Sequence, residues 1–192
     1  MLAIHSAYIG PPLQWGAVIS ASLVAAAFDV RSRRIPNWLT GSLFLLGLVW
    51  TTSTHGWQGL WSGLEGALLL GLPYVLLFLF ASGGAADAKM MGAIGMWLGP
   101  WIGLRVLAAV MIAGAVIGIA YAARKRRLAT VAANMTLIAS GFAQVATGGQ
   151  KLEQVRETFP DPNQMLTVPY GLAILAGTIL GAVWICLRHT GT

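Results

Sequence analysis

Residues 13–36 read LQWGAVISASLVAAAFDVRSRRIP, an apolar run that ends in a cluster of arginines and a proline. The length suits a membrane-crossing helix, which needs about 20 mostly apolar residues, and arginines after such a helix are typical of its cytoplasmic end. Of all 192 residues, 57% are hydrophobic and 9% are charged, whereas soluble domains carry about 25% charged residues. Water-soluble and disordered proteins are therefore excluded, and the sequence predicts an integral membrane protein.

Apolar stretches of this kind recur and predict an all-α bundle of about six transmembrane helices, which forms a single domain over residues 1–192. The expected spans are about residues 13–30, 38–54, 60–81, 88–98, 101–123 and 168–187. Residues 128–150 mix apolar and polar side chains, so two interpretations remain open: a helix on the cytoplasmic membrane surface, or a seventh span. The surface helix is the favoured interpretation.

The basic residues predict the orientation of the bundle. Of the 12 Lys and Arg residues, only Arg105 and Arg188 fall on one side of the expected membrane, and the rest fall on the side of Arg31–Arg34. Because basic loops stay inside, that side is expected to be cytoplasmic, with both termini outside. The net charge of +6 then reflects topology and not nucleic-acid binding. With one cysteine and three scattered histidines, no metal site or cofactor is expected.

Two aspartates are expected at the cytoplasmic end of the bundle. Asp29 ends the first span, and Asp87 begins the fourth after the small residues 82–86. Ionisable residues at span edges are costly and suggest a function by default. Two carboxyls that meet there would share a proton and could activate water for attack on a peptide bond, as in aspartyl proteases. The spacing alone also permits simpler roles, namely an ion pair of Asp29 with the arginines after it and a helix N-cap at Asp87.

Three segments resemble the signatures of the type IV prepilin peptidases, a family of intramembrane aspartyl proteases of the GxGD class. Residues 29–40, DVRSRRIPNWLT, resemble the first signature, an Asp followed by Arg-Ile-Pro-Asn. Residues 84–89, GAADAK, resemble the GxGD motif with its Lys, and residues 168–173, VPYGLA, resemble the Pro-Tyr-Gly of the last span. The resemblance covers essentially the whole chain. It departs at Ala86, where the motif has glycine, and a positive φ there would cost alanine about 1 kcal/mol.

The resemblance implies a prepilin leader peptidase that cleaves the basic leader from prepilins at the cytoplasmic face of the bacterial inner membrane. It implies that Asp29 and Asp87 are the catalytic pair. Further residues in or near the motifs are expected to position the site or the substrate, and these are Lys89, Gly84, Arg34 and Tyr170.

The first cytoplasmic loop is short and has no cysteine. In this the chain resembles the peptidase-only members that process Flp/Tad pilins, so no N-methyltransferase activity is expected. The expected partners are the prepilin, through its leader and apolar helix, and the lipid bilayer, whereas the oligomeric state stays open. The alternative is a small multi-pass transporter that uses Asp29 and Asp87 as a proton or cation relay.

Overall fold

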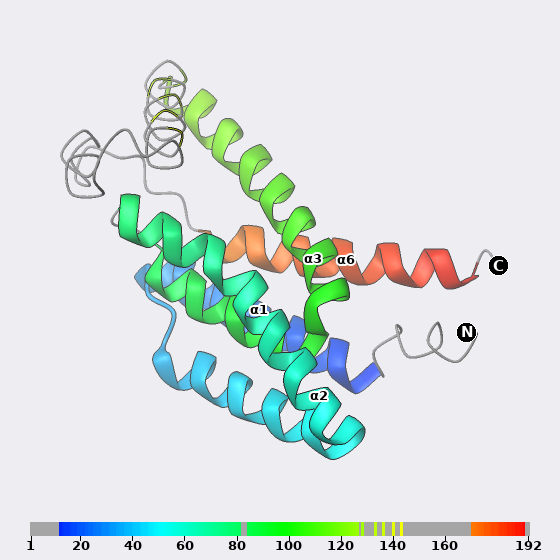
Figure 1. Cartoon of the computed structure of the whole chain (residues 1–192). Helices are drawn as coiled ribbons and strands as arrows, with labels where there is room; N and C mark the ends of the chain where they lie inside the picture. The colour runs from blue at the N-terminus through cyan, green and yellow to red at the C-terminus, as the bar shows by residue number, and fades with distance from the viewer. Residues whose placement is uncertain are drawn as a thin grey trace.

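The computed structural model describes residues 12–81, 84–126 and 170–190, and the single residues 128, 133, 136, 140 and 143. In these ranges the regular secondary structure is all helical and comprises four helices, α1 (Pro12–Ser32), α2 (Asn37–Ala81), α3 (Ala85–Arg124) and α6 (Gly171–Thr190) (Figure 1). The all-α prediction is therefore confirmed. The expected surface helix at residues 128–150 lies almost entirely outside the described residues.

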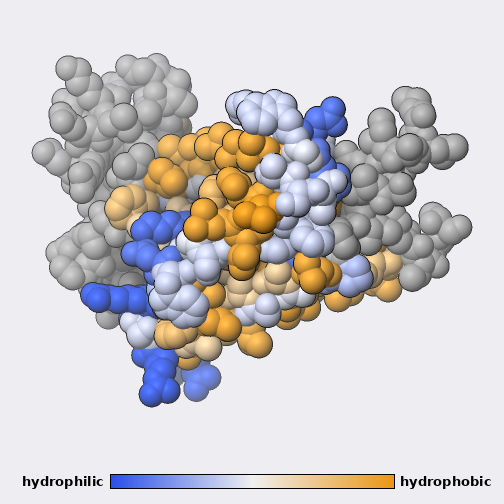
Figure 2. Space-filling view, turned by 90° about the horizontal axis from the view of Figure 1, so that it is seen from below, coloured by the Kyte–Doolittle hydropathy of each residue, from blue (hydrophilic) through white to orange (hydrophobic). Residues whose placement is uncertain are grey.

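The helices have the surface of a membrane protein. α1, α2 and α3 are long and apolar enough to cross a membrane, and α6 contains a shorter apolar stretch, Gly171–Leu187. Many outward side chains are apolar, for example Leu45, which is 62% exposed, and Leu68, which is 70% exposed. Figure 2 shows hydrophobic residues across the middle of one face and hydrophilic residues at its edges, on the left, the lower left and the upper right. An apolar surface of this extent is stable when lipid covers it.

α2 and α3 each contain one glycine whose backbone is not helical. Gly56 has φ 59° and ψ −144°, and Gly99 has φ 65° and ψ −177°, which glycine adopts far more readily than other residues. At Gly56 the helix turns back, so that a first arm (37–55) and a second arm (57–81) run in opposite directions (Figure 1). α3 likewise has a first arm (85–98) and a second arm (100–124), which begins at Pro100 because proline suits a first helical turn.

The predicted count of about six helices is not confirmed. The first expected span lies in α1 and the last overlaps α6, but the four expected spans between them occupy two helices. These spans are residues 38–54 and 60–81 in α2, and residues 88–98 and 101–123 in α3.

Both arms of α2 pack on the first arm of α3. A Cβ atom at Gly66 would collide with the carbonyl oxygen of Gly95, and a Cβ atom at Gly95 would collide with the backbone of Gly66. These backbones therefore touch, as small residues allow in membrane helices. The indole N–H of Trp97 donates to the carbonyl oxygen of Leu43 at 2.8 Å, which ties the first arm of α2 to α3. Since α6 packs against α1 and α3, the four helices meet around one interior.

Candidate active site

Asp29 lies on the inner face of α1, one turn before the helix ends. The same face carries the fully buried residues Val18, Ser22 and Ala25, which are spaced three or four residues apart. Asp29 itself is half-buried, and its Oδ2 accepts a hydrogen bond of 2.7 Å from the backbone N–H of Gly171. Gly171 begins α6, so this N–H has no acceptor inside its own helix. Asp29 therefore joins the end of α1 to the start of α6.

Asp87 lies in the first turn of α3 and is also half-buried. The helix begins after Gly84, which has φ 93° and ψ 10° and whose carbonyl accepts a hydrogen bond of 2.8 Å from the N–H of Ala88. This left-handed conformation suits glycine. Ala86 is helical, so the alanine in place of the motif glycine carries no positive φ. The N-cap of α3 is Gly84 and not Asp87.

The structure places Asp29 and Asp87 in the same region of the bundle, although 58 residues separate them in the sequence. Their side chains lie close enough for their charges to interact. Both residues lie at the end of the bundle that carries the exposed residues Arg33 and Arg34, in the loop between α1 and α2. Two half-buried carboxyls in one place can share a proton and act as an acid and a base on the same water molecule.

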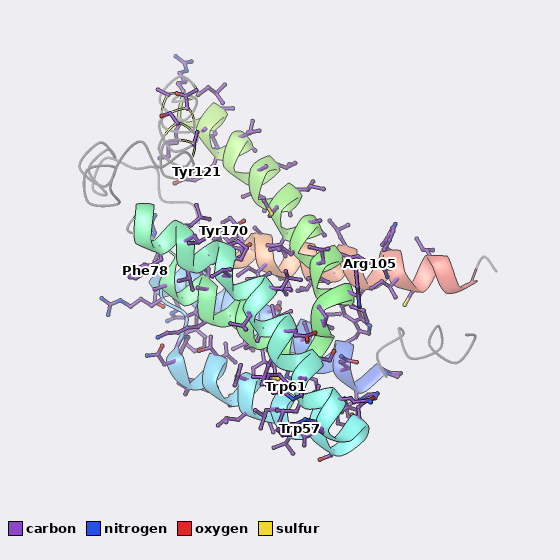
Figure 3. All side chains as sticks on the ribbon, in the orientation of Figure 1. Trp57, Trp61, Phe78, Arg105, Tyr121 and Tyr170 are labelled. Atoms are coloured by element: carbon purple, nitrogen blue, oxygen red, sulfur yellow. The ribbon has the colours of Figure 1, made fainter. Side chains whose placement is uncertain are left out.

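Two tyrosines border the aspartate pair. Tyr74 comes from the second arm of α2, and Tyr170, labelled in Figure 3, directly precedes α6. Their rings meet edge to face with centroids 5.7 Å apart, and the Tyr74 hydroxyl donates to the Tyr170 hydroxyl at 3.4 Å. Both lie close enough to Asp87 to interact with its charge. Tyr170 is expected from the sequence, whereas Tyr74 is not, because it lies in an apolar span without a surrounding motif.

The Lys89 side chain is not directed toward the aspartate pair. It follows Asp87 by two residues, which places it about 200° further around the helix. Its side chain is exposed, and its Nζ donates to Asn37 Oδ1 at 3.0 Å, at the start of α2. Among the described residues, the hydrogen-bond partner of Lys89 is thus Asn37 and not an aspartate. Lys89 connects the two motif segments 29–40 and 84–89, and the structure does not bring it to the carboxyl pair.

Apolar grooves open on the outer faces of the described helices. The larger, of about 980 Å³, lies between the two arms of α2 over α3, and its lining includes Gly71 and Lys89. Another, of about 560 Å³, lies between α1 and the first arm of α2 and includes Trp38 in its lining. The described lining of neither groove includes Asp29 or Asp87, which face the interior of the bundle. Among the described residues, no three His, Cys, Asp or Glu side chains are grouped to hold a metal ion.

The region that carries both aspartates is similar to a known family. A family model described as the type IV leader peptidase family matches residues 16–119, which is more than half of the chain. The match includes Asp29, Tyr74 and Asp87, and it ends before Tyr170 and α6. No curated protein and no solved structure matches the chain.

Proposed function

The chain belongs to the type IV leader peptidase family, and we propose that it is an aspartic endopeptidase that removes the leader from prepilins of the Flp/Tad type. The observation that supports the proposal is the nearness of two half-buried carboxyls, Asp29 from α1 and Asp87 from α3, whose charges interact. Both fall inside the matched region and inside the two segments that resemble the family's signatures.

In the proposed reaction Asp29 and Asp87 share one proton and hold a water molecule between them. The ionised carboxylate takes a proton from the water molecule while the oxygen of that water attacks the scissile carbonyl carbon. At the same time the protonated carboxyl gives its proton to the carbonyl oxygen. The tetrahedral intermediate then collapses, one carboxyl protonates the leaving nitrogen, and the other recovers a proton from the intermediate. The leader leaves with a new carboxyl end and the pilin with a new amine, while the pair again holds one proton.

The proposal places the carboxyl pair at the cytoplasmic face of the bacterial inner membrane. The exposed residues Arg31, Arg33 and Arg34 follow Asp29 directly, and basic residues that flank membrane helices remain on the cytoplasmic side. The apolar helix of a prepilin would then lie in lipid beside the bundle, and its basic leader would stay in water. This pose brings the leader junction to the depth of the aspartates.

A peptidase without N-methyltransferase activity is part of the proposal. The loop between α1 and α2 comprises only residues 33–36. A connection of this length holds no folded insert, and this supports the similarity to the short, peptidase-only members.

The test is cleavage of a synthetic Flp-type prepilin, with its leader and apolar helix, by the purified protein in liposomes. Asp29→Asn and Asp87→Asn keep the side-chain shape but remove the carboxyl, and each is expected to lower kcat on the order of 1000-fold or more. Glu65→Gln is the matched control, because it makes the same change at an exposed acid in α2. Unchanged cleavage by either aspartate variant would overturn the proposal, and proton flux without cleavage would favour the relay alternative.

A further inference from the structure

We propose that Gly171, with Tyr170 as its anchor, positions Asp29 for the reaction, so that the active site extends into α6 and beyond the family match at residues 16–119. The proposal rests on the peptidase function proposed above. Gly171 acts through Asp29 and does not itself touch the peptide bond, so its role is that of a positioning residue.

The contact between α6 and Asp29 is a short hydrogen bond to a carboxyl group. The N–H of Gly171 meets Asp29 Oδ2 at 2.7 Å, at the short end of the range for bonds to a carboxylate, which are stronger than bonds between neutral groups. Because an N–H can only donate, Oδ2 is held as an acceptor, and the second oxygen remains available to a water molecule. Rotation of the carboxyl would break this bond, so the bond restricts the direction in which Asp29 presents its free oxygen.

Space, and not backbone conformation, requires glycine at position 171. Gly171 has no positive φ, so another residue could adopt its backbone geometry. A Cβ atom there would lie 2.9 Å from the Cβ of Asp29, and 3.1 Å from both Asp29 Oδ2 and the Cα of Ala26. A side chain at this position therefore moves α6 away from α1 or displaces Asp29. Glycine allows the close approach that the hydrogen bond needs.

Tyr170 holds the start of α6 in place. Its ring packs on the buried ring of Tyr74 from α2, and its hydroxyl accepts the hydrogen bond from Tyr74. On the α3 side the ring meets Gly114, where a Cβ atom would lie 2.7 Å from the Tyr170 hydroxyl oxygen and 2.8 Å from its Cε2. Figure 3 shows Tyr170 where α6 begins beside α2 and α3. Two consecutive residues thus connect α6 to the other three described helices.

Two substitutions at position 171 compare a variant that keeps the N–H with one that loses it, and the proline ring also adds two carbon atoms beyond Cβ. Gly171→Ala and Gly171→Pro both add a Cβ atom, but only proline lacks the N–H. Proline is well tolerated at the first position of a helix, which is the position that Gly171 holds in α6. Gly118→Ala is the matched control, because a Cβ atom at Gly118 meets nothing within 4 Å. For each variant, kcat and KM are measured separately with the synthetic prepilin in liposomes.

The expected results form a series. Gly118→Ala matches the wild type, and Gly171→Ala lowers kcat about tenfold because its Cβ atom displaces Asp29. Gly171→Pro lowers kcat by a further factor of about 10 to 100, the range for a lost hydrogen bond to a charged group. KM is expected to stay within about twofold in all variants, because the proposed role of Gly171 is to hold Asp29 and not to contact the substrate. Equal kcat values in the two variants, or a change in KM as well, would show that the hydrogen bond does not set the rate.

The outcomes distinguish this proposal from the proposed function. If the wild type cleaves the prepilin and the two Gly171 variants have equal kcat, the positioning role is overturned and the peptidase function stands. If the wild type does not cleave, the proposed function fails.

A second measurement depends neither on activity nor on the folding of Gly171→Pro. The amide of Gly171 is expected to exchange with solvent deuterium at least about tenfold faster in Asp29→Ala than in the wild type, because its acceptor is removed. Asp87→Ala is the control and is expected to leave that exchange within about twofold. Equal exchange in Asp29→Ala and the wild type overturns the proposal.

Discussion

Asp29 and Asp87 are held in place by different parts of the molecule. Asp87 depends on its own neighbourhood, because Gly84, three residues before it, adopts the left-handed conformation from which α3 begins. Asp29 depends on a distant partner, because the N–H that it accepts belongs to Gly171, 142 residues away. One half of the carboxyl pair is therefore determined by a short segment. The other half is complete only when α1 and α6 pack together.

The largest expected effect tests whether these differently held groups act as one unit. The double variant Asp29→Asn/Asp87→Asn is expected to lower kcat on the order of 1000-fold, no more than either single variant, because in the proposed mechanism one shared proton serves both carboxyls. The measurement is single-turnover cleavage of the synthetic prepilin in liposomes. A double variant slowed by the product of the two single effects would show two independent contributions.

Substitution of Gly84 tests whether the start of α3 holds Asp87 in place. Gly84→Ala is expected to lower the free energy of unfolding by about 1–2 kcal/mol, because a residue with a Cβ atom is strained at φ 93°, and to lower kcat about tenfold as the first turn of α3 shifts. Thermal unfolding in detergent and cleavage rates measure the two effects. Ala86→Gly restores the motif glycine but sits in helical backbone, so it is expected to cost about 0.5–1 kcal/mol without any gain in kcat. A faster Ala86→Gly enzyme would contradict this assignment of the positive φ to Gly84.

Substitutions of Tyr74 and Tyr170 test how firmly the start of α6, with Gly171, is anchored. Tyr74→Phe and Tyr170→Phe each remove one hydroxyl from a shared hydrogen bond, which is worth about 0.5–1.5 kcal/mol. Each is expected to lower kcat about threefold to tenfold, and the double variant no further than the singles. Tyr121→Phe, near the C-terminal end of α3, is the matched control in the same cleavage assay, because the described hydrogen bond between Tyr74 and Tyr170 does not include it. Wild-type rates in both site variants would show that ring packing alone anchors α6.

The smallest effect is expected at the link between the two motif segments. Lys89→Met breaks the exposed hydrogen bond to Asn37 and is expected to lower kcat by no more than about threefold, because the bond lies away from the carboxyls. Asn37→Ala removes the same bond from the other side and is expected to match it. The cleavage assay compares kcat of both variants with that of the wild type. A loss of about 100-fold in Lys89→Met alone would assign Lys89 to the carboxyl pair after all.

The fold is largely predictable because its determinants are local. Apolar length and the arginines after residue 30 predict the first helix, and the structure places it at Pro12–Ser32. Breaks are expected between residues 54 and 60 and at Gly99-Pro100, where glycine and proline interrupt helices by their own chemistry. The structure has non-helical backbone within these two breaks, at Gly56 and at Gly99.

The site is predictable only in part, because only some of its determinants are local in the sequence. Asp29, Asp87 and Gly84 lie in short motifs, and their types alone suggest carboxyl chemistry and a tight turn. Tyr74 lies in an apolar span without a motif. Gly171 lies in the segment 168–173, but its hydrogen bond to Asp29 depends on packing between residues 142 positions apart, which that segment alone does not reveal. Nearness in sequence also misleads at Lys89, because two residues along a helix place side chains on nearly opposite faces.

The hydrogen bond between Gly171 and Asp29 has a consequence for biosynthesis. Both acids emerge from the ribosome well before Gly171 is translated, so a nascent polypeptide carries its acid pair while one member still lacks its donor. Under the proposed function, full proteolytic competence arises only when α6 has been inserted next to α1. A chain that ends before α6 is then expected to cleave prepilin more slowly than the full-length protein, although it already holds both acids.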